Sequence, residues 1–253
     1  MKKLLFCILV SASLTACTNK QTPNNTSLIQ QNLKGKVQTI SEITINFDST
    51  GIEKSDSTIK ISDFNSDGYI TTITSKDSSG SITEIQTIAL NTNGTVSEVK
   101  KSKDGKQISR FKTELDKDGN YTGGKSYDSA NNQDGYVTDF KTNEYGILYS
   151  GKEHLMNGKI KNSWDAKFEG PNFIGYNATD SVGRNSNGTV KLNEKGDAIN
   201  EIYNYYENDK AVTKNYNHTY DSYDNKGNWT QRSTFEQDKK TTIVKRVFTY
   251  YKD

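Results

Sequence analysis

The 253-residue sequence is poor in cysteine, proline and histidine, with two of each. Cys7 and Cys17 both lie near the N-terminus, so the body of the chain has no thiol for a disulfide, a zinc site or a nucleophile. His154 and His218 show no metal-ligand spacing with each other or with a cysteine. We therefore expect no disulfide framework and no cofactor.

The chain also lacks an excess of charge and a large aliphatic core. It has 33 basic and 31 acidic residues, and without Lys2 and Lys3 the two totals are equal. A balanced charge argues against nucleic acid as a partner, because binding to phosphates needs a basic surface. Leu, Ile, Val and Phe make up 43 of the residues after Cys17, so tyrosine must supply part of the buried surface.

The N-terminus has the pattern of a secretory signal. Lys2 and Lys3 precede an apolar run from Leu4 to Leu14, which as a helix would rise about 16 Å and is too short to span a membrane. Leu-Thr-Ala-Cys17 resembles the lipobox of bacterial lipoproteins, which implies removal of residues 1–16 and a lipid such as palmitate on Cys17. An ordinary secretory signal that happens to precede a cysteine is the alternative.

This resemblance implies a cell-envelope protein anchored to a membrane by its lipid. The outer membrane is the expected site, on the periplasmic side or at the surface. Residues 17–33 are polar, contain Pro23 and show no periodicity, so they are predicted to be the lipidated cysteine and a flexible tether. A tether of this length reaches roughly 20 to 25 Å.

A turn motif recurs along the rest of the chain. Asp or Asn followed three residues later by Gly is typical of a type I turn closed by a left-handed glycine, so each copy predicts the tip of a β-hairpin. Ten copies are interpreted as turns: 48–51, 65–68, 77–80, 91–94, 116–119, 132–135, 143–146, 185–188, 193–196 and 224–227.

Short runs rich in Thr, Ile, Val and Tyr separate these turns, and no segment has the pattern of a long amphipathic helix. The sequence therefore predicts an all-β fold: an antiparallel meander of short hairpin repeats that forms an extended or curled sheet. Apolar residues such as Ile70 and Ile73 follow the turns with a spacing of three, which predicts either β-bulges or strands with two partly covered faces.

Two copies carry a family resemblance. Tyr223-Asp-Asn-Lys-Gly-Asn-Trp-Thr230 is similar to the YD repeat of RHS-type proteins, and Leu115 to Thr122 is a weaker copy. The resemblance implies a curled antiparallel sheet that acts as a shell or scaffold. Residues 165–187 contain Pro171 and Gly170 and interrupt the rhythm of the repeated turns, so they are predicted to be an irregular connector between an N-terminal array, 34–164, and a C-terminal array, 188–253.

Two possible ligand sites follow from the residues. Asp63, Asn65 and Asp67 match the start of a calcium-binding loop, but the glutamate at its twelfth position is replaced by Thr74, so the hairpin-turn interpretation is preferred. Tyr205, Tyr220, Tyr223 and Trp229 belong to a late aromatic cluster that could stack on a glycan or a protein ligand. The preferred alternative is that these rings form the core of the C-terminal sheet.

No nucleophile elbow or phosphate-binding glycine loop is present in the sequence. We therefore predict a lipid-anchored, non-catalytic binding or scaffold protein of the bacterial envelope. The alternative is an envelope glycan-acting enzyme that uses a carboxylate pair, which would need two convergent acids in a cleft.

Overall fold

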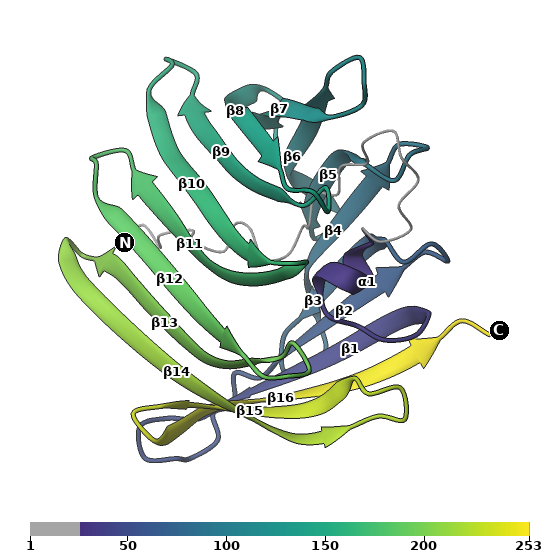
Figure 1. Cartoon of the computed structure of the whole chain (residues 1–253), viewed down its shortest axis with the longest axis vertical. Helices are drawn as coiled ribbons and strands as arrows, with labels where there is room; N and C mark the ends of the chain where they lie inside the picture. Colours follow the sequence, from purple (N-terminus) through teal and green to yellow (C-terminus); the bar gives the residue numbers. More distant parts are fainter. Residues whose placement is uncertain (1–25, 253) are drawn as a thin grey trace.

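The protein is a closed antiparallel β-barrel of 16 strands, as the computed structural model shows for residues 26–252 (Figure 1). Each strand pairs with the next one in the sequence, and β16 pairs with β1. The strands are β1 Val37–Asn46, β2 Thr58–Phe64, β3 Ile70–Lys76, β4 Ile82–Leu90, β5 Val96–Lys103, β6 Lys106–Leu115, β7 Tyr121–Tyr127, β8 Gln133–Thr142, β9 Leu148–Leu155, β10 Ile160–Glu169, β11 Asn172–Asp180, β12 Asn185–Leu192, β13 Ala198–Glu207, β14 Lys210–Tyr223, β15 Trp229–Glu236 and β16 Lys239–Tyr250.

The prediction of an extended or curled sheet is wrong, because the sheet closes on itself. Closure is made by β1 and β16, which pair from Val37 with Tyr250 to Asn46 with Thr242. Closure removes the two unpaired edges that an open sheet would present. The all-β class and the antiparallel order are confirmed.

Eight of the ten predicted turns are present. In each, the backbone N–H of the glycine donates to the carbonyl of the Asp or Asn three residues earlier, as Gly94 does to Asn91 at 3.0 Å. Gly94 and Gly227 have φ of 82° and 89°, the left-handed conformation that the motif requires.

The remaining two motifs lie within strands. Gly135 belongs to β8 and Gly188 to β12. The hairpin before β8 instead uses Asp128 and Asn131, and Asn131 takes the left-handed conformation with φ of 67°. Asparagine tolerates this conformation better than most residues, so the turn forms without glycine.

The predicted bulges are present beside the turns. The pairing of β2 with β3 shifts between Asp63 and Phe64, next to the 65–68 turn. This shift allows Ile70 and Ile73 to be buried together although their spacing is odd.

The chain before β1 crosses one end of the barrel. Helix α1, Ser27–Gln30, lies beside β2 and β3 (Figure 1), and the Leu28 N–H donates to the Gly68 carbonyl at 3.2 Å. Asn32 Nδ2 then donates to the Lys195 carbonyl at 2.7 Å. The last residues of the predicted tether are therefore folded, and Leu33 is buried. Residues 1–25, with the predicted signal peptide and Cys17, lie outside the described residues.

Residues 165–187 form the end of β10, all of β11 and the start of β12, in contrast to the predicted irregular connector. β10 pairs with β11 and β11 with β12 in antiparallel register. The N-terminal and C-terminal arrays are thus continuous parts of one sheet.

The core lies where the α1 segment meets the barrel. Ile40, Ile73 and Ile88 are buried in one cluster with Leu33, and Leu28 packs against it. The turns at this end also contact their neighbours, as Tyr69 does at Gly94. At the opposite end, the turn glycines Gly80, Gly105 and Gly183 have no such neighbour. We call the two the α1 end and the free end.

Candidate functional site

The strand pairing assigns every side chain to one of two faces. Ile40 and Glu42 share a face with their partners Phe248 and Arg246. This face contains the buried cluster around Ile40, so it is the inner face of the barrel. Ile43, which alternates with these residues, lies on the outer face.

Aromatic side chains form a belt on the inner face. Adjacent rings within it have centroids 6.3 to 6.4 Å apart, except across the step from Trp164 to Tyr176. The aromatic belt consists of Phe111, Phe140, Trp164, Tyr176, Tyr203 and Tyr216.

Glycines on the inner face provide space for these rings. A Cβ on Gly188 would lie 2.5 Å from Tyr176 Cε1 and 2.9 Å from Tyr203 Cδ1. A Cβ on Gly151 would lie 2.5 Å from Trp164 Cζ2. Pairing a large ring with a glycine on the next strand lets the ring lie against the wall and stabilises the sheet.

The belt is open to solvent although it faces inward. All six of its side chains are only half-buried. Side chains fill the interior of a barrel of about eight strands, whereas barrels of about 16 strands leave an aqueous channel. A barrel of this size is therefore expected to hold a hydrated interior, which we call the lumen, and the aromatic belt lines it.

Charged side chains extend this lining across β13, β14, β15, β16 and β1. We call Glu42, Glu201, His218, Arg232 and Arg246 the charged inner cluster. Arg246 Nε donates to Glu42 Oε1 at 2.9 Å, and the Arg246 guanidinium lies 3.5 Å from the centre of the Trp229 ring. Cation and aromatic ring attract each other at this distance.

Glu201 has two partners on the inner face. It accepts a hydrogen bond of 2.8 Å from the Tyr203 hydroxyl, and its Oε1 lies 3.5 Å from His218 Nε2. The other ring nitrogen of His218 is 3.0 Å from the Thr234 hydroxyl. His218 is buried, so these neighbours fix its ring in the wall.

Both carboxylates of the cluster are ionised at neutral pH. Burial raises the pKa of Glu42, but the charges of Arg246 and Lys60 outweigh burial and bring the pKa below its ordinary value. Burial likewise raises the pKa of Glu201, but the adjacent His218 and the hydrogen bond from Tyr203 outweigh burial and bring the pKa below its ordinary value. Burial also raises the pKa of Tyr220 to about 12, although the Arg232 charge acts in the opposite direction.

The structure brings three of the four predicted platform residues together. Tyr220 lies with its ring centre 5.7 Å from that of Trp229 and 6.2 Å from that of Tyr223. Trp229 is only 8% exposed because Arg246 covers it, so its ring is part of the wall. Tyr205 is further along β13 on the inner face and pairs with Val212.

Two of the three possible calcium ligands, Asp63 and Asn65, have other partners. Asn65 Oδ1 accepts hydrogen bonds from the N–H groups of Asp67 and Tyr69, which closes the turn. Asp63 Oδ1 accepts a 3.0 Å hydrogen bond from the Thr39 hydroxyl. Among residues 26–252, no group of three or more His, Cys, Asp or Glu side chains could hold a metal ion.

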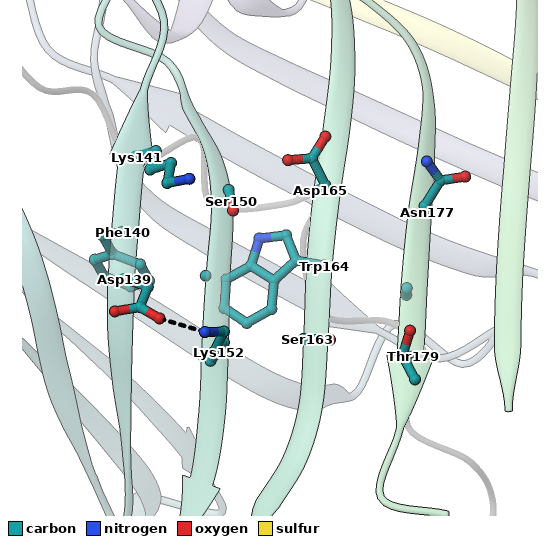
Figure 2. A pocket seen from close by; sticks show the side chains of 12 residues that line it. Asp139, Phe140, Lys141, Ser150, Lys152, Ser163, Trp164, Asp165, Asn177 and Thr179 are labelled. Atoms are coloured by element: carbon teal, nitrogen blue, oxygen red, sulfur yellow. Dashed lines mark ion pairs between the residues drawn. The ribbon is translucent and has the colours of Figure 1, made fainter. Parts of the chain in front are cut away.

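The outer face has a shallow hollow of about 430 Å³ across β8 to β11 (Figure 2). Its polar side chains lie in the rows on either side of the row that contains Phe140, Gly151, Trp164 and Ala178, which also line it, so the hollow opens outward. Asp139 and Lys152 form an ion pair of 2.7 Å at its margin. The polar lining consists of Asp139, Lys141, Ser150, Lys152, Ser163, Asp165, Asn177 and Thr179.

Charged residues also occupy the outer face of the neighbouring strands. Glu98 pairs with Lys100 at 2.7 Å and with Arg110 at 3.7 Å, and Lys125 pairs with Glu114 at 2.8 Å. In the part of the chain that the structure describes, no helix has the length and apolar character needed to cross a membrane.

The sequence interpretation missed the charged inner cluster. Its members come from strands far apart in the chain, since Glu42 and Arg246 are separated by 204 positions. One local signal was available in β14, where Tyr216, His218 and Tyr220 alternate with polar residues. That period of two predicts one shared face.

No known protein family matches this sequence, and no curated protein is significantly similar to it. The fold of this chain places it among the closed antiparallel β-barrels. The chain is similar to the crystal structure of a porin-like protein from Bacteroides uniformis. That protein is 14% identical with a TM-score of 0.55, over 90% of this chain and 100% of the other.

Two further structures are more distant. A porin-like protein from Bacteroides vulgatus is 9% identical with a TM-score of 0.38, over 83% of this chain and 97% of the other. The Photorhabdus luminescens Tc holotoxin pore is 14% identical with a TM-score of 0.34, and this chain spans only 11% of its length. The similarity to the Bacteroides uniformis protein shows a common fold and not a common function.

Proposed function

We propose that this protein is a non-catalytic binding protein of the bacterial cell envelope whose ligand enters the lumen of the barrel. The observation that carries the proposal is the solvent-open aromatic belt on the inner face. Binding sites are typically concave and lined by aromatic side chains with a few placed polar groups. The belt supplies the rings, and the charged inner cluster beside it supplies the polar groups.

The protonation states favour binding over hydrolysis. A glycosidase needs one carboxylic acid whose pKa is raised so that it can donate a proton. Glu42 and Glu201 both have lowered pKa values. These two acids of the charged inner cluster are therefore suited to accept hydrogen bonds.

The outer face argues against a barrel that crosses a bilayer. A membrane-spanning barrel carries an outward apolar band about 25 Å tall. Here Glu98, Lys125 and Lys152 lie at outward positions within strands. A lysine at the midplane of a bilayer costs about 2 to 4 kcal/mol, so several of them favour an outer surface in water.

We further propose that the lipid on Cys17 holds the barrel at a membrane. Nine residues lie between Cys17 and Ser27, and a chain of that length extends at most about 30 Å. The α1 end would then face the membrane and the free end would face away from it. Cys17→Ser should abolish palmitate labelling and leave unprocessed precursor; a cleaved, membrane-bound variant would contradict the anchor.

Tryptophan fluorescence tests the site of binding. Trp164 and Trp229 are the two tryptophans of the chain and both face inward, so a ligand in the lumen should change their emission. The mature protein would be screened against envelope glycans and extracts. Tyr216→Ala should weaken each ligand that changes the emission, whereas Asn177→Ala on the outer face should not. Ligands that bind without an emission change and depend on Asn177 would contradict binding in the lumen.

A further inference from the structure

We propose that Arg232 in the lumen binds the carboxylate of an acidic sugar. This inference rests on the proposed function and specifies its ligand. Arg232 lies on β15 and pairs with Tyr220 on β14, so its side chain belongs to the inner face. Its guanidinium lies 5.3 Å from the centre of the Trp229 ring.

Arg232 is the cation of the charged inner cluster without a carboxylate partner. Within residues 26–252, no carboxylate oxygen lies at ion-pair distance from it, and its buried Nε has no hydrogen-bond partner. Buried polar groups are nearly always satisfied, so the Nε–H without an acceptor marks Arg232 as a guanidinium whose hydrogen-bonding capacity the protein leaves partly unused.

The neighbouring carboxylates already have other partners. Glu42 accepts from Arg246 at 2.9 Å, and Glu201 accepts from the Tyr203 hydroxyl at 2.8 Å. His218 Nε2 is buried without a hydrogen bond and lies 3.5 Å from Glu201. Both carboxylates of the charged inner cluster therefore have partners other than Arg232.

The surroundings favour a sugar as the carrier of the carboxylate. Tyr203 and Tyr216 present half-buried rings with centres 6.3 Å apart, which suits the face of a pyranose ring. Arginine binds a carboxylate through two parallel N–H···O hydrogen bonds, which fixes the orientation of the bound group. The tyrosine rings would hold the sugar, and Arg232 would select its acid group.

The experiment compares two probes on the mature, full-length protein. Trigalacturonic acid and its methyl ester have the same rings, but only the acid has carboxylates. We expect the acid to bind at least tenfold more tightly, and Arg232→Gln to remove this preference. Arg110→Gln is the matched control, because Arg110 also has an unpartnered buried Nε but lies on the outer face beside Glu98.

The outcomes separate the inference from the proposed function. Equal affinity for acid and ester, or equal losses in Arg232→Gln and Arg110→Gln, would overturn the role of Arg232. If neutral oligosaccharides bind and depend on Tyr216 but not on Arg232, the lumen site stands and the acidic-sugar inference fails. If Arg232→Gln does not fold, Arg232→Lys is the second variant. It keeps the positive charge but cannot form the two parallel hydrogen bonds, so it should lose most of the preference for the acid.

Discussion

Trp164 lies over Gly151 on the inner face of the barrel, while Ser163 and Asp165, one position away on the same strand, line the polar hollow outside. The same alternation recurs at Tyr203, between the outward residues Ile202 and Asn204. One wall thus presents rings and buried charges to the lumen and solvated groups to the exterior. The difference predicts that substitutions on the inner face affect stability and the proposed ligand binding, whereas substitutions on the outer face have smaller effects.

The largest expected effect comes from Trp229. Its ring is 8% exposed under Arg246, so Trp229→Ala should lower the free energy of unfolding by about 3 to 5 kcal/mol. Val247 on the outer face is 64% exposed, and Val247→Ala should change stability little. Urea unfolding measures both. If Trp229→Ala lowers the free energy of unfolding only slightly, Trp229 is not part of the packed wall and is instead an exposed binding platform.

The second-largest effect is expected from breaking the ion pair on the inner face, and breaking one on the outer face should cost much less stability. Glu42→Gln leaves Arg246 buried without its carboxylate and should cost roughly 3 kcal/mol. The Asp139–Lys152 pair is half exposed to solvent, so Asp139→Asn should leave the urea midpoint unchanged. Equal losses in the two variants would break the distinction between the faces.

A glycine on the inner face gives a smaller effect. Gly188→Ala places a Cβ 2.5 Å from Tyr176 Cε1 and should cost about 1 to 3 kcal/mol, because the ring must move. Thr189→Ala, at the exposed neighbouring position, is the control and should be nearly neutral. If Gly188→Ala has the same urea midpoint as the wild-type protein, the packing of Tyr176 and Tyr203 does not require the absence of a side chain at position 188.

The pH dependence should be the mildest signal. The pKa values of Glu42 and Glu201 are lowered from 4.5 in the folded protein, so their contribution is complete above that pH and is lost as the pH falls through the lower, folded values. Stability should therefore decline below about pH 4.5, the unfolded reference. Glu42→Gln should flatten this decline in urea titrations between pH 3 and 6. An unchanged slope would show that Glu42 does not contribute to it.

Local features of the fold were predictable from the sequence, and its closure was not. The turn at Asn91 to Gly94 depends on four consecutive residues, so its motif predicts it. The pairing of β1 with β16 joins opposite ends of the chain, and no local pattern distinguishes it from an open sheet. Gly188 shows the limit of the motif, because the same spacing also serves a ring from a neighbouring strand.

The candidate site was predictable only in part. The aromatic cluster identified Tyr220, Tyr223 and Trp229, which the structure brings together. The sequence does not distinguish Arg232 and Glu201 from its other charged residues, 64 in all. Their role depends on which face of the barrel they occupy and on their neighbours. Those neighbours are set by the register of the closed barrel.

The most direct test measures which solvent each face of the barrel meets in the membrane-bound protein. Cys17 is the only cysteine outside the predicted signal and is lipidated in the proposed mature form, so a spin label on a new cysteine would be unique. Asn177→Cys labels the outer face and Ala166→Cys the inner face. Both labels should be accessible to a water-soluble relaxation agent, and the inner label should lose that accessibility when ligand binds. An outer label accessible to oxygen but shielded from the water-soluble agent would contradict the central claim and show a barrel embedded in lipid.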